Sequence, residues 1–340
     1  MFNVGDVNKH SHPLLCNGNF LTLLFWEELT TEYRKWQVRQ DGGGLMRILH
    51  ISDLHFGIAD SKKITEEEKR ERAYFFEDLL VGLKKITEKS PVDYALVTGN
   101  ITFEASWNGY QEAEEWLGEL ARACGISLHQ IYLCPGEYEL SDGANLSKYS
   151  WFCKNLGLPA YFFGGEKNYL AGVAQHRDFR IICADTLWFT QNMNKKAVWE
   201  AVSCLKAELK RIQNLDDNCP TVAVLRRPLE YGCNQYADTL KGNALYDDLC
   251  QTANLVLTGG ACKLAATCLY RGNAMICGNG AAIHNGRYHH NFHIYDFGSG
   301  EIAKMYGSRL LYEFDGRSWH RENLLLKYQY AIVKPEYMMA

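Results

Sequence analysis

The chain has 340 residues, of which 47% are hydrophobic and 22% are charged, with 36 lysines and arginines against 40 aspartates and glutamates. This length allows one or two hydrophobic cores, and the composition excludes a disordered chain. A net charge of −4 gives no indication of nucleic-acid binding. The twelve cysteines include no C-x-x-C pair, so we interpret them as reduced residues of a cytoplasmic protein.

The N-terminal part of the sequence has no segment that predicts a membrane anchor. Its longest apolar run, Phe20–Trp26, is much shorter than the about 20 residues that span a bilayer, and we expect no secretory signal. Three glycines, Gly42–Gly44, precede the first predicted strand, so residues 1–45 are interpreted as an N-terminal extension. Near-helical spacing of apolar residues between positions 21 and 33 predicts a helix. This helix docks a partner or another copy of the chain, or it packs on its own domain, or the segment is an upstream start with no role.

After the glycines, strand-like and helix-like segments alternate. Strands are predicted at 46–52, 94–98, 130–134, 179–183, 221–225 and 255–257, and helices at 66–90, 109–124, 146–156, 196–213 and 243–252. Further segments at 270–277, 288–297 and 302–314 are typical of paired antiparallel strands. This order predicts an α/β fold in which helices cover a sheet, with a β-rich end. Residues 46–315 form one predicted domain, and 316–340 a C-terminal tail.

Polar or glycine-containing loops follow five of the predicted strands, where the functional groups of α/β sheets gather. They are 53–55, 99–102, 135–139, 226–229 and 258–262. In the first loop, Asp53 and His55 are two residues apart and can turn toward the same cation, because carboxylates and imidazoles are both metal ligands. This pair alone is a weak indication of a metal site.

The order of the five loops resembles that of the calcineurin-like metallophosphoesterase superfamily, over about residues 46–315. The family pattern is D-x-H, G-D, G-N-H-D/E, a histidine often followed by His-Pro, and G-H-x-H. Here Ile51–Gly57 keeps the first motif, and Val97–Thr102 (V-T-G-N-I-T) is similar to V-S/T-G-D-L/I-T. The resemblance implies a sandwich of two mixed β-sheets flanked by helices. It also implies two divalent cations that share a carboxylate and generate the hydroxide that attacks phosphorus.

Six ligand or catalytic positions of the family carry other residues here. The metal-bridging aspartate falls at Asn100, the asparagine ligand and catalytic histidine at Glu137 and Tyr138, the next metal histidine at Arg226 or Arg227, and the closing histidines at Gly260 and Cys262. An asparagine lacks the bridging charge, and an arginine repels a cation. We therefore expect the second metal to be absent.

Two interpretations stay open for the first metal. In one, a single divalent metal (Zn, Mn or Fe) is held by Asp53, His55, Glu137 and Cys262, with Asn100 as a further candidate. In the other, no metal binds and Arg226 forms an ion pair with Glu137 or Asp53.

Candidates for catalysis and for phosphate binding follow from the same positions. Tyr138 and Asn100 are candidate catalytic residues, although a phenol with a reference pKa of about 10 is a poor acid–base group at neutral pH. Tyr138 alternatively fills the space of the family's histidine. Arg226 and Arg227 can hold a phosphate bidentately.

The last part of the sequence adds a histidine-rich stretch. It comprises His284, His289, His290 and His293. These histidines either bind a metal or a phosphate, or they are solvated or packed residues in or beside a strand.

Three functions from different classes are consistent with these patterns. The first is a pseudoenzyme that acts as an assembly or regulatory module. The second is an active phosphoesterase that uses one metal and an arginine phosphate clamp. The third is a nucleotide or phosphate sensor without turnover. We expect a protein partner or a homo-oligomer, with residues 1–45 as the first surface to test, and a phosphate-containing ligand in the second and third cases.

Overall fold

The computed structural model describes most of the chain from residue 46 onward. The described ranges are 46–60, 64–89, 91–136, 138–140, 147–158, 171–175, 179–184, 195–215, 219–225, 242–259, 268–271, 274–278, 290–299, 304–314, 319–324 and 330–331. The chain divides into two compact units, Met1–Gly44 and Leu45–Ala340, and the described residues all belong to the second. The helix predicted within residues 1–45 lies outside the described residues.

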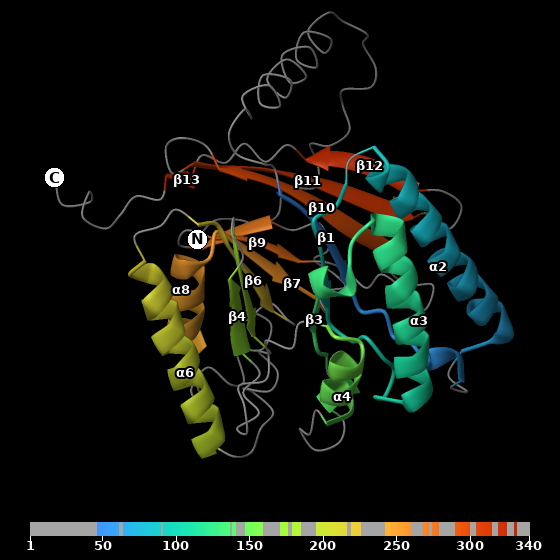
Figure 1. Cartoon of the computed structure of the whole chain (residues 1–340), viewed down its shortest axis with the longest axis horizontal. Coiled ribbons are helices and arrows are strands. Elements are labelled where there is room, and N and C mark those ends of the chain that lie inside the picture. The colour runs from blue at the N-terminus through green and yellow to red at the C-terminus, as the bar shows by residue number, and fades with distance from the viewer. Residues whose placement is uncertain are drawn as a thin grey trace, which may run out of the picture. The chain divides into compact units, whose positions relative to one another are not determined.

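Two mixed β-sheets form the centre of the second unit (Figure 1). The first runs in the order β12-β11-β10-β1-β2-β3, and β13 also pairs with β11. In this sheet β1, β2 and β3 are parallel, while β10 is antiparallel to β1. Its strands are β1 (Met46–Ser52), β2 (Tyr94–Thr98), β3 (Ile131–Cys134), β10 (His290–Ser299), β11 (Lys304–Phe314), β12 (Trp319–Leu324) and β13 (Tyr330–Ala331).

The second sheet runs in the order β4-β5-β6-β7-β9-β8. Its central strands β5, β6, β7 and β9 are parallel, and the edge strands β4 and β8 are antiparallel to their neighbours. The strands are β4 (Ala171–Gln175), β5 (Arg180–Ala184), β6 (Thr221–Leu225), β7 (Leu255–Thr258), β8 (Cys268–Arg271) and β9 (Ala274–Gly278).

Helices cover the outer sides of the two sheets (Figure 1). On the side of the first sheet lie α2 (Glu66–Thr87), α3 (Trp107–Cys124) and α4 (Ser147–Asn155), and on the side of the second lie α6 (Lys195–Gln213) and α8 (Gly242–Thr252). Short 3₁₀ helices occur at η2 (Ile58–Asp60), η3 (Leu128–Gln130) and η4 (Tyr138–Leu140). Within the described ranges, every helix is too short or too polar to cross a membrane.

Local sequence signals fix the ends of the two helices next to the candidate site. Helix α2 begins after a capping box in which Thr65 and Glu68 exchange side-chain-to-backbone hydrogen bonds. Helix α3 begins after Ser106, whose hydroxyl accepts a hydrogen bond from the Gly109 N–H at 3.1 Å. It ends at Gly125, which adopts a left-handed conformation with φ 68°.

Alternation along the strands of the first sheet produces two layers of core. In β1, Leu49 and Ile51 pack toward α2 and α3, whereas Ile48 packs toward the second sheet. The layer between the sheets takes Leu96 from β2 and side chains such as Val224 from β6. Strands buried on both faces explain the nearly continuous apolar runs of β2 and β6.

The predicted fold class, two mixed β-sheets flanked by helices, is confirmed. The structure adds elements that the sequence did not predict. The segment predicted as one strand at 270–277 is the hairpin pair β8 and β9. The predicted tail at 316–340 contains β12 and β13, which both pair with β11, and β4 was also missed. The sequence of β12, W-H-R-E-N-L, is mostly polar and gives little strand signal, and its hydrogen-bonded pairing with β11 defines it as a strand.

Candidate functional site

The candidate site lies where three parallel strands end side by side. Ser52 of β1 is paired with Thr98 of β2, and Thr98 is paired with Cys134 of β3. The loops that follow these strands therefore begin at one edge of the sheet, as expected for functional loops of α/β folds. They carry Asp53 and His55, then Asn100, then Tyr138.

The loop after β1 runs along the loop after β2. The backbone N–H of Asp53 donates to the Thr98 carbonyl at 2.9 Å, and that of His55 donates to the Asn100 carbonyl at 3.0 Å. Both Asp53 and His55 have positive φ, 55° and 51°, and both are buried. A left-handed conformation costs a non-glycine residue about 1–2 kcal/mol, so these hydrogen bonds hold the loop in a strained shape.

A partly buried arginine from α2 supports this loop. The Arg72 guanidinium donates to the carbonyls of Leu54 and His55 at 2.6 and 2.7 Å, and it lies 4.8 Å from the Phe76 ring centroid. Burial lowers the pKa of Arg72 to about 10, and the Glu112 carboxylate acts in the opposite direction. Arg72 therefore remains charged at neutral pH. Sequence reasoning missed it, since it lies within an ordinary charged helix.

The Asp53 carboxylate is packed against the backbone of the loop after β2. Its Oδ1 accepts a hydrogen bond from the Asn100 N–H at 3.2 Å. Gly99 has φ 80°, and a Cβ at this position would lie 2.5 Å from Asp53 Oδ1. Glycine is therefore required here both for the backbone conformation and for the space beside the carboxylate.

Asn100 occupies the buried centre of the site and contacts the loop after β3. Its Oδ1 accepts a hydrogen bond from the Tyr138 N–H at 3.1 Å. A Cβ at Gly136 would collide with the same oxygen. The neutral amide of Asn100 thus joins the second and third loops directly.

Glu139 joins the same two loops through three hydrogen bonds. Its carboxylate accepts from the backbone N–H and the hydroxyl of Thr102, at 2.7 and 2.8 Å, and from the Gly136 N–H at 2.7 Å. Only 2% of Glu139 is exposed. Sequence reasoning did not single it out, although the position matches the final acidic residue of the G-N-H-D/E pattern.

Tyr138 packs as an aromatic side chain in this site. Its ring centroid lies 5.5 Å from that of His55, edge to face, and 5.0 Å from that of Phe103. These contacts support the interpretation that Tyr138 fills space, and the described contacts of its ring are with His55 and Phe103.

The fourth and fifth loops start close to this edge. The Gly259 N–H, after β7, donates to the Leu225 carbonyl at the end of β6, and a Cβ at Gly259 would lie 2.6 Å from Thr98 Oγ1. The residues predicted to act there, Arg226, Arg227, Gly260 and Cys262, lie outside the described residues, as does Glu137.

The described part of the site lacks the carboxylate that bridges two metals in the family. Asn100, at the bridging position, is a neutral amide whose oxygen already accepts the Tyr138 N–H. In the described part of the chain, no three His, Cys, Asp or Glu side chains come together to hold a metal ion. Asp53 and His55 remain as two family ligands on one loop.

The histidine-rich stretch contributes one buried residue. His293 of β10 lies opposite His50 of β1, with ring centroids 6.2 Å apart on the side of the sheet that faces the second sheet. His50 Nε2 is 3.0 Å from Thr98 Oγ1, and His293 Nδ1 is 2.9 Å from the Tyr295 hydroxyl. Burial lowers the pKa of His50 to about 3. His293 is therefore a packed strand residue, whereas His284 and His289 lie outside the described residues.

Comparison with known proteins establishes the family. A model of the calcineurin-like phosphoesterase family matches residues 46–258, and the chain belongs to this family. Members of the family typically bind divalent metals. An uncharacterised metallophosphoesterase-like protein of Bacillus subtilis (strain 168), YydB, is 27% identical over 96 residues. This alignment covers 28% of the present chain and 18% of that relative.

Two solved structures are similar to this chain at low sequence identity. GAP50, described as the anchor in the inner membrane complex of Plasmodium, is 12% identical with a TM-score of 0.50, and the match covers 85% of this chain and 91% of that one. A single mutant of Vps29 from Entamoeba histolytica is 12% identical with a TM-score of 0.36, over 82% and 99% of the two chains.

Proposed function

We propose that this chain is a degenerate member of its family, a pseudoenzyme that acts as an assembly or regulatory module. One observation carries the proposal. Asn100, at the position of the family's metal-bridging aspartate, is a buried amide whose oxygen is held by the Tyr138 N–H.

The physical argument concerns charge. Two divalent cations a few ångströms apart repel each other strongly, and the bridging carboxylate and hydroxide offset that repulsion. An amide oxygen offers only a dipole, so Asn100 removes a full negative charge from the place where both cations need it. Arg226 or Arg227 stands at the position of a metal-binding histidine of the family and adds a positive charge there.

A second argument comes from which motif residues match the family. In the second and third motifs, the matching residues Thr102 and Glu139 make the buried hydrogen bonds that hold the loops together. The positions that differ, Asn100, Glu137 and Tyr138, are those with ligand or catalytic roles in the family. This pattern is consistent with selection for the scaffold rather than for hydrolysis.

The module role implies a protein partner or a homo-oligomer. GAP50 is described as an anchor in a membrane complex, so a protein of this fold has been assigned an anchoring role. At 12% identity the likeness shows the fold alone, and the role is carried to this chain only as part of the proposal.

A single-metal phosphoesterase is the second candidate. It is favoured by Asp53 and His55, two family ligands that lie buried on the same loop. In this case Glu137 and Cys262, with Asn100 as a further ligand, complete a site for one Zn, Mn or Fe ion, and Arg226 and Arg227 bind the phosphate. A bound metal would supply a water of lowered pKa.

Metal analysis and hydrolysis assays on the purified full chain separate the two. We expect hydrolysis of bis-p-nitrophenyl phosphate with added Mn²⁺, Zn²⁺ or Mg²⁺ to be no faster for the wild type than for Asp53→Ala. The exposed substitution Glu119→Gln is the matched control. Turnover that Asp53→Ala abolishes and Glu119→Gln preserves, together with one stoichiometric metal, would replace the pseudoenzyme with the single-metal enzyme.

The variant Asn100→Asp tests whether the missing bridging charge is the only obstacle to hydrolysis. We expect it to fold, because a carboxylate can also accept the Tyr138 N–H, but to remain inactive, because other ligand positions are substituted as well.

Thermal stabilisation of the wild type by a nucleotide, without turnover, would instead favour a sensor. Ligand at 100 times its dissociation constant adds about 2.7 kcal/mol of stability.

A further inference from the structure

Two tryptophans lie together on the surface of the second unit. Trp107 is the first residue of α3 and Trp151 lies in α4, and they are 53% and 49% exposed. Their ring centroids are 5.0 Å apart and their planes meet at 88°. The two perpendicular rings form an apolar corner. Contiguous apolar groups on a protein surface often mark an interaction site.

Trp107 connects this corner to the core beneath it. Trp107 lies against Tyr110, with ring centroids 6.4 Å apart, and Tyr110 lies against Phe152 at 4.9 Å. Tyr110 and Phe152 are each 1% exposed. The contacts of Trp107 with Tyr110 and Trp151 reduce the side-chain entropy that binding at the corner would cost.

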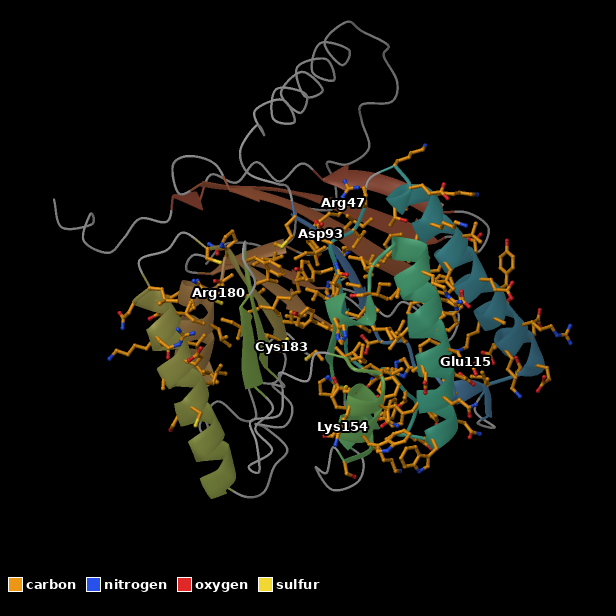
Figure 2. The ribbon with its side chains drawn as sticks, in the orientation of Figure 1. Arg47, Asp93, Glu115, Lys154, Arg180 and Cys183 are labelled. Atoms are coloured by element: carbon orange, nitrogen blue, oxygen red, sulfur yellow. The ribbon has the colours of Figure 1, made fainter. Side chains whose placement is uncertain are left out.

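Positive charge flanks the corner. Lys148 Nζ lies 5.9 Å from the Trp107 ring centroid and donates to the Ala105 carbonyl at 3.4 Å. Lys148, Trp151 and Lys154 follow one another at intervals of three along α4, so they share one side of that helix, and Lys154 is exposed (Figure 2). Helix α4 contains no aspartate or glutamate. The exposed acidic residue Glu104 lies three residues before Trp107 in the sequence.

We propose that Trp107, Trp151, Lys148 and Lys154, here called the tryptophan patch, dock an extended, acidic, proline-containing segment of a partner protein. Proline rings of an extended chain pack on tryptophan faces, and the fixed backbone of such a segment loses little entropy on binding. Carboxylates of the segment pair with the two lysines. The inference rests on the proposed role as an assembly module and names the chemistry of its partner.

The chain's own features favour this occupant over two others. A single-stranded nucleic acid also stacks on tryptophans, but it requires a strongly basic track, and the net charge of the chain is −4. A second copy offers few segments of this kind, because the chain has seven prolines among its 340 residues.

Peptide selection on the full-length chain tests the patch. A displayed library of random peptides about twelve residues long is enriched on the immobilised protein, and the selected peptides are measured by fluorescence anisotropy. We expect them to carry proline and an excess of aspartate and glutamate. Their affinity is expected to fall about tenfold or more in Trp107→Ala and in Trp151→Ala, as for buried aromatic anchors of interfaces.

Matched variants make the result specific. Tyr74→Ala removes an aromatic side chain of similar exposure, 56%, on α2 and is expected to leave the affinity unchanged. The double variant Lys148→Gln/Lys154→Gln is expected to weaken binding and to reduce its dependence on salt. Unchanged melting temperatures would show that the tryptophan variants fold.

Several outcomes would overturn the proposal. These are an absence of enriched peptides, selected peptides that are basic or lack proline, and affinities that Trp107→Ala leaves unchanged. A homo-oligomer that dissociates in Trp107→Ala would assign the patch to a second copy, and oligothymidylate binding lost in that variant would assign it to nucleic acid. Hydrolytic activity is read separately, so an active chain that still binds acidic peptides refutes only the pseudoenzyme.

Discussion

At the scale of single residues, the site depends on backbone shapes that few residue types allow. Asp53 and His55 adopt positive φ without being glycines, and Gly99 supplies both a positive φ and the space for the Asp53 carboxylate. Arg72 donates to two carbonyls of the strained loop. The shape of the site is therefore set by residues beside the candidate ligands as much as by the ligands.

Gly99→Ala is expected to destabilise the protein by about 1–3 kcal/mol, because the new Cβ meets the Asp53 carboxylate at a left-handed position. Urea denaturation of wild type and variant measures the change. Gly118→Ala in α3 is the matched control. Its Cβ would meet nothing within 4 Å, and alanine favours a helix by about 0.5–1 kcal/mol, so this variant is expected to be neutral or more stable. Equal losses in both variants would contradict the steric argument.

Arg72→Met is expected to lower the free energy of unfolding by about 1–3 kcal/mol, because two loop carbonyls lose their charged donor in a buried place. Arg122→Met, which removes an exposed arginine paired with Glu119 on α3, is expected to change it by no more than about 0.5 kcal/mol. Chemical denaturation compares them. A loss of similar size at both arginines would refute the special role of Arg72.

At the scale of elements, the three site loops are tied to one another by side chains. Glu139 joins η4 to the loop after β2, and Asn100 joins that loop to the residues after β3. These side-chain hydrogen bonds connect the loops after β2 and β3 beyond the point where backbone pairing of the two strands ends. The site edge consequently behaves as a continuation of the parallel sheet.

Glu139→Gln is expected to destabilise the protein by about 1–3 kcal/mol. Both oxygens of the carboxylate accept hydrogen bonds, three in total, whereas the amide of glutamine replaces one oxygen with a donating NH₂ group. Hydrogen exchange of the Thr102 and Gly136 amides is expected to become faster. The exposed Glu119→Gln controls for the loss of one charge. Unchanged exchange at both amides in Glu139→Gln would contradict the loop tie.

At the scale of the whole unit, the layer between the two sheets contains buried histidines among apolar residues. His50 and His293 face the second sheet beside Thr98 and Tyr295. A buried imidazole with a lowered pKa stays neutral in the folded state while it is protonated in the unfolded chain. The packing of the two sheets is therefore linked to pH.

Stability is expected to fall as the pH is lowered from about 6.5 toward 3. In this window the unfolded chain binds a proton at His50 and the folded chain does not. The free energy of unfolding contributed by this group therefore falls by up to about 1.4 kcal/mol per pH unit. Denaturation at several pH values measures the slope. His50→Gln is expected to reduce the slope, whereas His129→Gln, at an exposed position, should leave it unchanged. A slope insensitive to His50→Gln would exclude this source.

By itself the sequence determined the alternation of strands and helices, the fold class and the substitutions at family positions. Segment 221–225 was predicted with its observed bounds, because a short buried parallel strand is a compact apolar run. Asn100 was recognised because residue types at fixed spacing can be compared with a family pattern. Strands β4 and β12 were missed, because their sequences, A-G-V-A-Q and W-H-R-E-N-L, lack the compact apolar run of a buried strand.

Only the tertiary structure decided which groups meet. The bond from Tyr138 to Asn100, the bonds from Thr102 to Glu139 and the support by Arg72 each join residues that are 17 to 38 positions apart. His50 and His293 meet because β1 and β10 pair in one register. Such contacts depend on strand register and loop path, which many distant residues fix together, whereas a local sequence pattern records only the residues of one segment.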